Sequence, residues 1–288
     1  MNVRALGTYA HRMPRVPVCL SIAGSDSGGG AGIQADLKAF AAAGVHGTTA
    51  ITAITAQNTL AVCAVEAVSP DMIGAQVRAV ADDMGVDAVK IGMLGDAQTV
   101  RAVAEALAAL PRATPVVVDP VMVAESGARL LDADAQQALI ELVLPRATVV
   151  TPNLPEARAL AGDEAGAGPD EAEALAGAVH ALGSANVVVT GGHRETAVDV
   201  FFDGTAFTAI PGPRYPDGCA HGSGCTHSST LAAFLALGAT PLEAARRARQ
   251  TAGLAVRDGL RGLGRGPGPV DVLGVGARTG LTDGPGLP

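Results

Sequence analysis

Short runs rich in valine and isoleucine alternate with helix-like stretches along nearly the whole chain. A helical pattern follows each of the strand-like runs Asp87–Ile91, Pro115–Asp119, Thr148–Thr151 and Asn186–Thr190. Continuous apolar strands of this kind are typical of a parallel sheet that is covered by helices on both faces. The alternation therefore predicts an α/β fold, a three-layer α/β/α sandwich with a mostly parallel central sheet.

The rest of the chain completes the predicted organisation. Two strand-like runs flank the turn Asp203-Gly204 and predict an antiparallel hairpin at one edge of the sheet. Because we find no internal repeat and no break in composition, we expect a single domain over residues 16–273. Residues 1–15 lack the continuous apolar segment of a signal peptide, and we expect a disordered extension there. The Gly/Pro-rich residues 274–288 are expected to form a disordered tail.

Polar and glycine residues gather directly after the predicted strands. The carboxyl ends of parallel strands share one edge of the sheet, and the ligands of such sheets bind beyond that edge. We therefore expect a functional site there. The residues that it would collect are Gly24-Ser25-Asp26, Gln57-Asn58, Asp119, Thr151-Pro152-Asn153 and Gly191-Gly192-His193.

Charge and composition argue against several classes of partner. The net charge of −8 and the scarcity of aromatic residues argue against nucleic-acid binding. No apolar run reaches the length of a membrane span without a glycine, proline or polar break, so we expect no membrane partner. Four cysteines, with Cys19 and Cys63 inside strand-like runs, do not resemble a disulfide framework and favour a reducing cytoplasm.

The segment Gly222–Cys225 (Gly-Ser-Gly-Cys) precedes a predicted helix over Thr226–Leu237. Glycines at a helix start allow several backbone N–H groups to point at one spot, where the helix dipole also favours an anion. A thiol at the same helix start, that of Cys225, is expected to have a lowered pKa and raised reactivity. The segment therefore predicts an anion hole with a base at its rim, as phosphoryl transfer requires.

A second glycine-rich loop, residues 24–32 (GSDSGGGAG), connects a predicted strand to a helix. It has neither the Gly-Lys-Ser/Thr of a P-loop nor the G-x-G-x-x-G spacing of a dinucleotide site. A tight turn with positive φ would explain one or two of its glycines. Five glycines together with Asp26 favour a loop that faces a ligand. Asp36, in the following helix, is compatible with either a functional role or a solvated helix position.

Asn153 and Glu156 lie three residues apart at a predicted helix start. One interpretation is a variant of the capping box, in which the asparagine is the N-cap and the glutamate side chain bonds back to its backbone. The other is a Mg²⁺ site beside nucleotide phosphates, since magnesium takes few carboxylates and keeps several waters. The pattern alone does not choose between them.

A zinc site is a weaker alternative elsewhere in the chain. Its spacing, C-x-H-x₃-C-x-H, is cramped and lacks the two-part knuckle of zinc fingers. The side chains concerned would be those of Cys219, His221, Cys225 and His227.

Taken in order, several segments resemble the bacterial hydroxymethylpyrimidine/phosphomethylpyrimidine kinases of the ribokinase-like superfamily. The resemblance extends from about Val16 to Val270, and its specificity comes from the order of the motifs, since each alone is weak. The matching segments are Ser21–Lys38, Ile54–Thr59, Lys90–Leu94, Val118–Val123, Ser126-Gly127, Thr151–Glu156, Gly191–His193, His221–Thr226 and Gly264–Val270. The resemblance implies a ribokinase-like fold and a two-step kinase of thiamine biosynthesis. It would use MgATP to phosphorylate 4-amino-5-hydroxymethyl-2-methylpyrimidine and then the monophosphate.

The resemblance also implies roles for residues on the substrate side. Gln57 would bind the pyrimidine edge, Asp36 would meet the hydroxymethyl group or ring substituents, and Met93 would pack on the ring face. An uncharged amide suits an aminopyrimidine, which offers an adjacent acceptor and donor. A thioether suits a flat ring. The remaining pocket residues would be Gly24, Asp26 and Ala31.

On the phosphate side, the implied roles fall into three groups. The Mg²⁺ ligands would be Asp119 and Glu156. The nucleotide contacts would be Asn153, Thr190, Gly192 and His221. The anion hole would be Gly222, Ser223 and Gly224, with Cys225 as the base.

The chain departs from the family pattern at two positions. Thr190 stands where many members have lysine, and only Lys38 and Lys90 are present in the whole chain. Phosphate charge would therefore be met by Mg²⁺, arginine or the helix end. Ser223 replaces the usual threonine, and we expect this change to be mild.

Related enzymes form dimers and cover the site with a flap, so the resemblance implies a homodimer and a flap over 124–131. Three other functions are compatible with parts of the sequence. A pyridoxal kinase would act on a similar hydroxymethyl-bearing aromatic ring. An inactive pyrimidine-binding regulatory protein would bind without turnover. A zinc-binding interaction protein would use the cysteine and histidine cluster.

Overall fold

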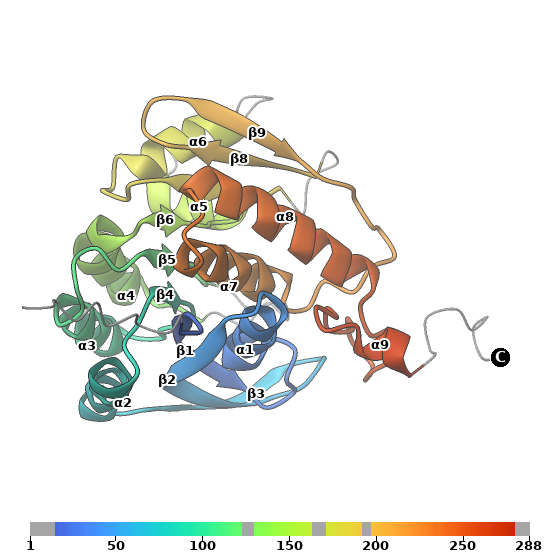
Figure 1. The fold of residues 1–288 in the computed structure, drawn as a ribbon, viewed down its shortest axis with the longest axis horizontal. Coiled ribbons are helices and arrows are strands. Elements are labelled where there is room, and N and C mark those ends of the chain that lie inside the picture. The colour runs from blue at the N-terminus through green and yellow to red at the C-terminus, as the bar shows by residue number, and fades with distance from the viewer. Residues whose placement is uncertain (1–14, 123–129, 163–170, 192–196, 280–288) are drawn as a thin grey trace, which may run out of the picture.

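One sheet runs through the middle of the molecule (Figure 1). The computed structural model describes residues 15–122, 130–162, 171–191 and 197–279, and in these ranges the sheet has nine strands. Their order across the sheet is β3-β2-β1-β4-β5-β6-β7-β8-β9. Their bounds are β1 Val18–Asp26, β2 His46–Gln57, β3 Val62–Ala67, β4 Ala88–Ile91, β5 Val116–Val118, β6 Val149–Val150, β7 Val187–Val189, β8 Val198–Phe202 and β9 Phe207–Pro211.

Helices cover both faces of the sheet, which confirms the predicted three-layer sandwich. Figure 1 shows α1, α7 and α8 together on one side, and α2 to α6 along the other. The bounds are α1 Gly32–Ala42, α2 Pro70–Asp83, α3 Ala97–Ala108, α4 Ala133–Ala138, α5 Leu154–Ala161, α6 Glu171–His180, α7 Ser223–Ala236, α8 Pro241–Arg257 and α9 Val275–Arg278. A π-helical turn over Leu139–Val143 and a 3-10 turn over Leu144–Arg146 follow α4.

Alternate residues of the central strands pack into two separate cores. In β1, Leu20 and Ile22 join the core that contains Ile73 of α2, whereas Cys19 joins the core that contains Phe40 of α1. All five side chains are fully buried. Successive side chains of a strand point to opposite faces, so a strand that is covered on both sides needs apolar residues at every position. This explains the unbroken valine runs that the sequence shows.

The central strands are parallel, but the sheet has antiparallel pairs at both edges. β8 pairs antiparallel with β7 and β9, as the predicted hairpin requires. β3 also pairs antiparallel with β2, so the expectation of a single antiparallel edge was wrong. The physical reason is the short connection over residues 58–61, since a parallel crossover needs a dozen or more residues.

The ends of the expected domain differ slightly from the described structure. Arg15, placed in the extension by the sequence, forms an ion pair with Asp87 (Nη2–Oδ1 2.7 Å). Helix α9 begins at Val275, inside the segment expected to be a disordered tail. Among the described residues, no helix has both the length and the apolar character needed to cross a membrane.

Candidate active site

The carboxyl edge of the sheet collects the polar residues that the sequence singles out. Asp26 and Gln57 end β1 and β2, and Asp119 follows β5. Beyond β6 and β7, Asn153 and Thr190 form an isolated parallel bridge, and the Thr190 N–H donates to the Pro152 carbonyl (2.9 Å). The parallel strand order brings these residues to one edge although they are spread over more than half of the chain.

Asp26 organises the first glycine loop from within. Its carboxylate accepts N–H groups from Gly28 (2.7 Å), Gly30 (3.0 Å) and Ala31 (2.8 Å), and lies 3.3 Å from His221 Nε2. Burial opposes ionisation, but hydrogen bonds from His221, Ala31 and Gly28 outweigh it and lower the pKa of Asp26. With all of these contacts inside the protein, Asp26 shapes the loop instead of facing a ligand as expected.

The two glycine-rich loops meet directly. Gly222 has a φ of +84°, and a Cβ atom there would clash with the Gly30 carbonyl. The ring of His221 packs on Gly30, which also has no room for a side chain. His221 therefore joins the two loops, a position that differs from the nucleotide contact implied by the resemblance.

Helix α7 begins at Ser223, three residues earlier than predicted, because Gly222 in its left-handed conformation forms the N-cap. The Ser223 N–H donates to the Ala220 carbonyl (2.9 Å) and so is already used. The N–H groups of Gly224 and Cys225 have no acceptor among the described residues. Open N–H groups at a helix start are suited to bind an anion, as the predicted anion hole requires.

The thiol of Cys225 is more strongly desolvated than its position at a helix start suggests. Burial raises the pKa of its thiol to about 12, and the carboxylates of Asp36 and Asp119 add to this, while Lys90 acts in the opposite direction. The sulfur also accepts the Gly32 N–H. The expectation of a lowered pKa was wrong for the ligand-free protein, because desolvation outweighs the helix terminus.

A buried ion pair lies beneath α7. Lys90 Nζ is 2.9 Å and 3.0 Å from the two carboxylate oxygens of Asp36, which also accepts hydroxyl hydrogen bonds from Ser21 and Ser229 (2.6 Å each). Burial disfavours the ammonium, but Asp36, followed by Cys225 and Asp119, raises the pKa of Lys90 above its usual range. Asp36 is 0 % exposed, so the implied contact with substrate is corrected to a structural one.

Lys90 is a residue to which sequence reasoning gave no role. Ser229 lies one helical turn after Cys225 and binds Asp36, so Cys225 and the ion pair share one face of α7. A signal was present in the sequence, because Lys90 interrupts an otherwise apolar strand run and lysine is almost never buried unless it is paired.

Two buried carboxyl groups, Asp119 and Glu156, lie close enough to influence each other. Asp119 accepts the Ser228 hydroxyl (2.9 Å), and burial raises its pKa although Lys90 and Ser228 oppose the shift. Burial, and next the Asp119 charge, raise the pKa of Glu156 to about 8. A cation that binds between two neighbouring carboxyl groups makes their ionisation favourable again.

The helix cap predicted as one interpretation of Asn153 and Glu156 is present. The Asn153 N–H donates to Glu156 Oε2 (3.0 Å), and the Glu156 N–H donates to Asn153 Oδ1 (2.9 Å). The cap does not exclude the Mg²⁺ interpretation, because the same geometry holds the glutamate beside Asp119. The two interpretations are therefore compatible.

The metal-free protein should lose stability as the pH rises from about 5 to about 8, by up to about 1.4 kcal/mol per unit. The folded state raises the pKa of Glu156 to about 8, so it retains a proton that the unfolded chain releases above the ordinary value of 4.5. Thermal denaturation across this range measures the effect. Glu156→Gln keeps the cap acceptor and should remove most of the slope, as should saturating Mg²⁺. An unchanged slope in this variant would contradict the assignment.

The residues expected to bind the pyrimidine lie at or near the ends of three strands, β1, β2 and β4. A Cβ atom at Gly24 would lie 2.5 Å from Met93 Cε, so glycine makes room for the thioether. The Thr55 hydroxyl donates to Gln57 Oε1 (3.2 Å), and the Gln57 N–H donates to the Ser27 hydroxyl (2.8 Å). Gly192, an implied nucleotide contact, lies outside the described residues.

The candidate zinc ligands do not converge. His227 Nε2 lies 3.2 Å from Asp199 Oδ2, whereas His221 contacts Asp26. Cys219 instead packs against Gly259 and Gly268. In the part of the chain that the structure describes, no group of three or more histidine, cysteine, aspartate or glutamate side chains is arranged to hold a metal.

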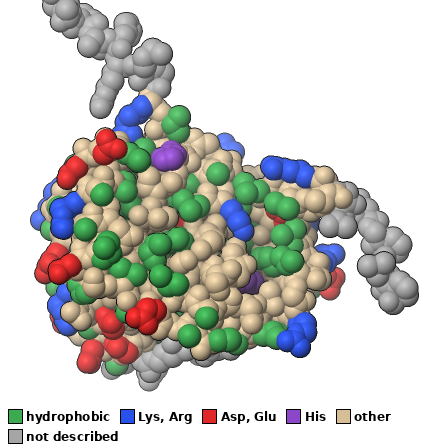
Figure 2. Space-filling view, turned by 90° about the horizontal axis from the view of Figure 1, so that it is seen from below, with side chains coloured by type: hydrophobic (Ala, Val, Ile, Leu, Met, Phe, Trp, Pro, Cys, Tyr) green, Lys and Arg blue, Asp and Glu red, His purple; other side chains and the backbone are tan. Residues whose placement is uncertain are grey.

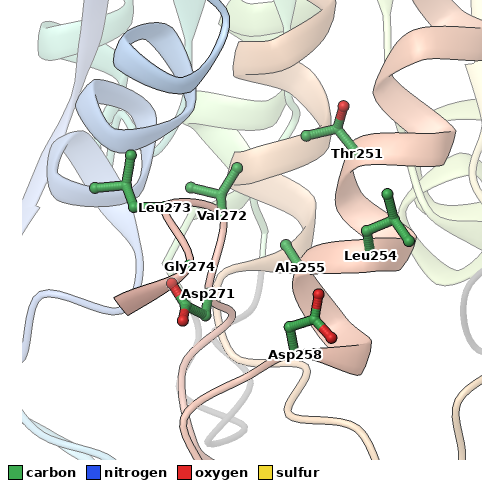
Figure 3. A pocket seen from close by; sticks show the side chains of 8 residues that line it. All are labelled: Thr251, Leu254, Ala255, Asp258, Asp271, Val272, Leu273 and Gly274. Atoms are coloured by element: carbon green, nitrogen blue, oxygen red, sulfur yellow. The ribbon is translucent and has the colours of Figure 1, made fainter. Parts of the chain in front are cut away.

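A separate hollow of about 380 Å³ lies between α8 and the segment that leads to α9 (Figure 3). Its two carboxylates have local partners, since Asp258 binds Arg257 (2.7 Å) and Asp271 accepts the N–H groups of Val275 (2.9 Å) and Gly276 (2.8 Å). None of the predicted site residues lines it. We assign it no part in the site.

Comparisons with known proteins agree with the resemblance. The family model for phosphomethylpyrimidine kinase matches residues 26–271. A hydroxymethylpyrimidine/phosphomethylpyrimidine kinase of Rhizobium meliloti is 50 % identical over 262 residues, covering 88 % of this chain and 96 % of that protein. The thiamine biosynthesis bifunctional protein ThiED of Geobacter sulfurreducens is 46 % identical, covering 88 % of this chain and 51 % of its own length.

The fold is shared with solved kinase structures as well. The ADP complex of Bacillus subtilis pyridoxal kinase has a TM-score of 0.79 and 38 % identity, covering 89 % of this chain and 97 % of that one. The resemblance drawn from the ordered motifs is thus confirmed. This chain belongs to the phosphomethylpyrimidine kinase family.

Proposed function

We propose that this protein uses MgATP to phosphorylate 4-amino-5-hydroxymethyl-2-methylpyrimidine and then its monophosphate, giving the pyrophosphate for thiamine biosynthesis. The observation that carries the proposal is the pair of open N–H groups at Gly224 and Cys225, beside Asp119. A Cβ atom at Gly224 would lie 4.0 Å from Asp119 Oδ2. The proposed anion hole and the candidate metal ligand therefore lie next to each other. The names of the relatives supply the substrate class.

In the first step, the hydroxymethyl oxygen attacks the γ-phosphorus of ATP. A new oxygen–phosphorus bond forms, the bond to the departing ADP oxygen breaks, and the hydroxyl proton passes to the Cys225 thiolate. The N–H groups of Gly224 and Cys225 stabilise the charge on the transferred phosphoryl group. Lys90 contributes positive charge on the same face of α7, which favours the thiolate against burial.

Asp119 and Glu156 fit a magnesium site, because both are buried carboxyl groups that lie close enough to influence each other and carboxylate oxygens are ligands that magnesium prefers. Mg²⁺ bound there would neutralise phosphate charge, a need that is increased by Thr190 in the position of the family's lysine. We assign the nucleotide contacts to Asn153, Thr190 and Gly192. Ser223 contributes to the helix start instead of donating its N–H to the phosphate.

On the substrate side, Gln57 binds the pyrimidine edge and Met93 covers the ring, with Gly24 and Ala31 as pocket walls. Asp36 acts indirectly, since it holds Lys90 in place. Asp26 acts through the shape of the glycine loop. The pocket therefore recognises the ring by an amide and a thioether, and the charged groups beneath it position the catalytic helix.

Pyridoxine kinase activity is a second candidate, favoured by the likeness to Bacillus subtilis pyridoxal kinase. Initial rates with the pyrimidine alcohol and with pyridoxine separate the two functions. We expect kcat/KM to be at least about tenfold higher for the pyrimidine, the scale on which one pocket contact discriminates. Higher kcat/KM for pyridoxine would reverse the assignment, and pyrimidine binding without ATP turnover would support a regulatory binder.

We further propose a cytoplasmic homodimer. The four cysteines are all free thiols, as a reducing compartment favours. The β2–β3 edge exposes Ile54 (55 %) and Val65 (53 %), an apolar surface that a second copy could cover. On the face seen in Figure 2, Lys and Arg side chains are scattered among acidic ones, which does not suit nucleic acid. Most of the proposed flap, 124–131, lies outside the described residues.

A further inference from the structure

Three buried polar side chains from three elements meet beside the end of β7. Asp199 of β8 is 1 % exposed, His227 of α7 is 5 % exposed and Arg249 of α8 is 9 % exposed. His227 Nε2 lies 3.2 Å from Asp199 Oδ2, and Arg249 Nε lies 3.7 Å from Asp199 Oδ1. None of them belongs to the phosphoryl-transfer machinery described above.

This cluster holds both residues that flank 192–196. Asp199 Oδ1 accepts the Gly191 N–H (2.8 Å), and Arg249 Nη2 donates to the Ala197 carbonyl (2.6 Å). A Cβ atom at Gly191 would clash with the Val198 carbonyl, so the backbone at Gly191 packs tightly against the backbone at Val198. The cluster therefore fixes the position of the residue that directly follows Thr190.

Buried charged side chains such as these contribute little to the stability of a protein core. The contacts of Asp199 with His227 Nε2 and Arg249 Nε lack hydrogen-bond geometry, and His227 Nδ1 has no hydrogen-bond partner among the described residues. Apolar side chains of similar volume would stabilise such a place at least as well. Buried polar atoms without partners are rare, and their presence calls for a role other than packing.

We propose that Asp199 is a positioning residue for the nucleotide, an inference that rests on the proposed kinase function. Through the Gly191 N–H it sets the end of β7, where Thr190 is bridged to Asn153. Its other oxygen faces His227, which lies two residues after Cys225 in α7. Asp199 thereby links the nucleotide side of the site to the helix whose first N–H groups stabilise the transferred phosphoryl group, and Arg249 contacts Asp199 from α8.

Calorimetric titration of the full chain with ADP and, separately, with the pyrimidine alcohol tests this role. Asp199→Asn retains an oxygen for the Gly191 N–H but removes the charge that faces His227 and Arg249. We expect ADP to bind about tenfold more weakly, while pyrimidine affinity stays within about twofold. Asp203→Asn, in the exposed turn of the same hairpin, is the matched control and should leave both affinities unchanged.

His227→Gln is a second variant, which removes the histidine without touching the acceptor of Gly191. We expect weaker ADP binding again, and the double variant should bind ADP no more weakly than Asp199→Asn, because both act through one contact. Unchanged ADP affinity in folded variants, or equal losses for ADP and pyrimidine, would overturn the inference while leaving the kinase function intact. A wild-type protein that binds no ADP would instead remove the kinase function and this inference together.

Discussion

Replacement of Cys225 by alanine should slow phosphorylation of the pyrimidine alcohol by about 10²–10⁴-fold, the usual contribution of a positioned base. Phosphorylation of the monophosphate should slow much less. The acceptor in that second step is a phosphate oxygen, which is already anionic near neutral pH and needs no base. Single-turnover rates measured with each acceptor, under saturating MgATP, compare the two steps directly.

Cys219→Ala is the matched control, because Cys219 is also a free thiol and lies outside the proposed anion hole. Its rates should resemble those of the wild type. Equal losses in both steps for Cys225→Ala would show that the thiol has a structural role only. The raised pKa of Cys225 in the ligand-free protein makes this experiment informative, since a base role requires that ligands favour the thiolate.

Replacement of Lys90 by methionine should destabilise the protein by roughly 3–5 kcal/mol, the cost of leaving one partner of a buried ion pair alone. The side chains of Lys90 and Asp36 are 1 % and 0 % exposed, so water cannot replace the lost ammonium. Urea denaturation followed by circular dichroism measures the loss. The same substitution should also reduce kcat, because the positive charge beside Cys225 is removed.

Two further variants separate charge pairing from packing. Lys38→Met removes the chain's other lysine, whose ammonium donates to the Gly29 carbonyl (2.7 Å) at a partly exposed position, and should cost about 1 kcal/mol or less. The double variant Lys90→Met with Asp36→Leu should recover much of the lost stability without recovering activity. A Lys90→Met protein as stable as the wild type would contradict the importance of the pair.

Much of the architecture could be predicted because it follows from local pattern. Continuous valine runs required strands covered on both faces, and the parallel order then brought Asp119, Asn153 and Thr190 to one edge. The second antiparallel edge was missed because the sequence pattern assigned no pairing partner to the residues that form β3, although the short loop before them allows only a hairpin.

The errors within the site have a common physical cause. Burial depends on the packing of α1 against α7, which no single segment reveals. Asp36 could be placed near the start of its helix, but not under Ser229 of α7 and against Lys90 of β4. The sequence correctly placed Cys225 near the start of a helix. Desolvation by the surrounding elements, however, reversed the expected shift of its pKa.

In the proposed function, one site carries out two successive phosphorylations of a pyrimidine. The most direct test incubates the purified protein with MgATP and 4-amino-5-hydroxymethyl-2-methylpyrimidine and resolves the products by mass over time. We expect two successive gains of about 80 Da, each matched by release of one ADP. A single gain would limit the enzyme to one step and turn attention to pyridoxal-type specificity, and no gain with pyrimidine still bound would contradict the kinase assignment.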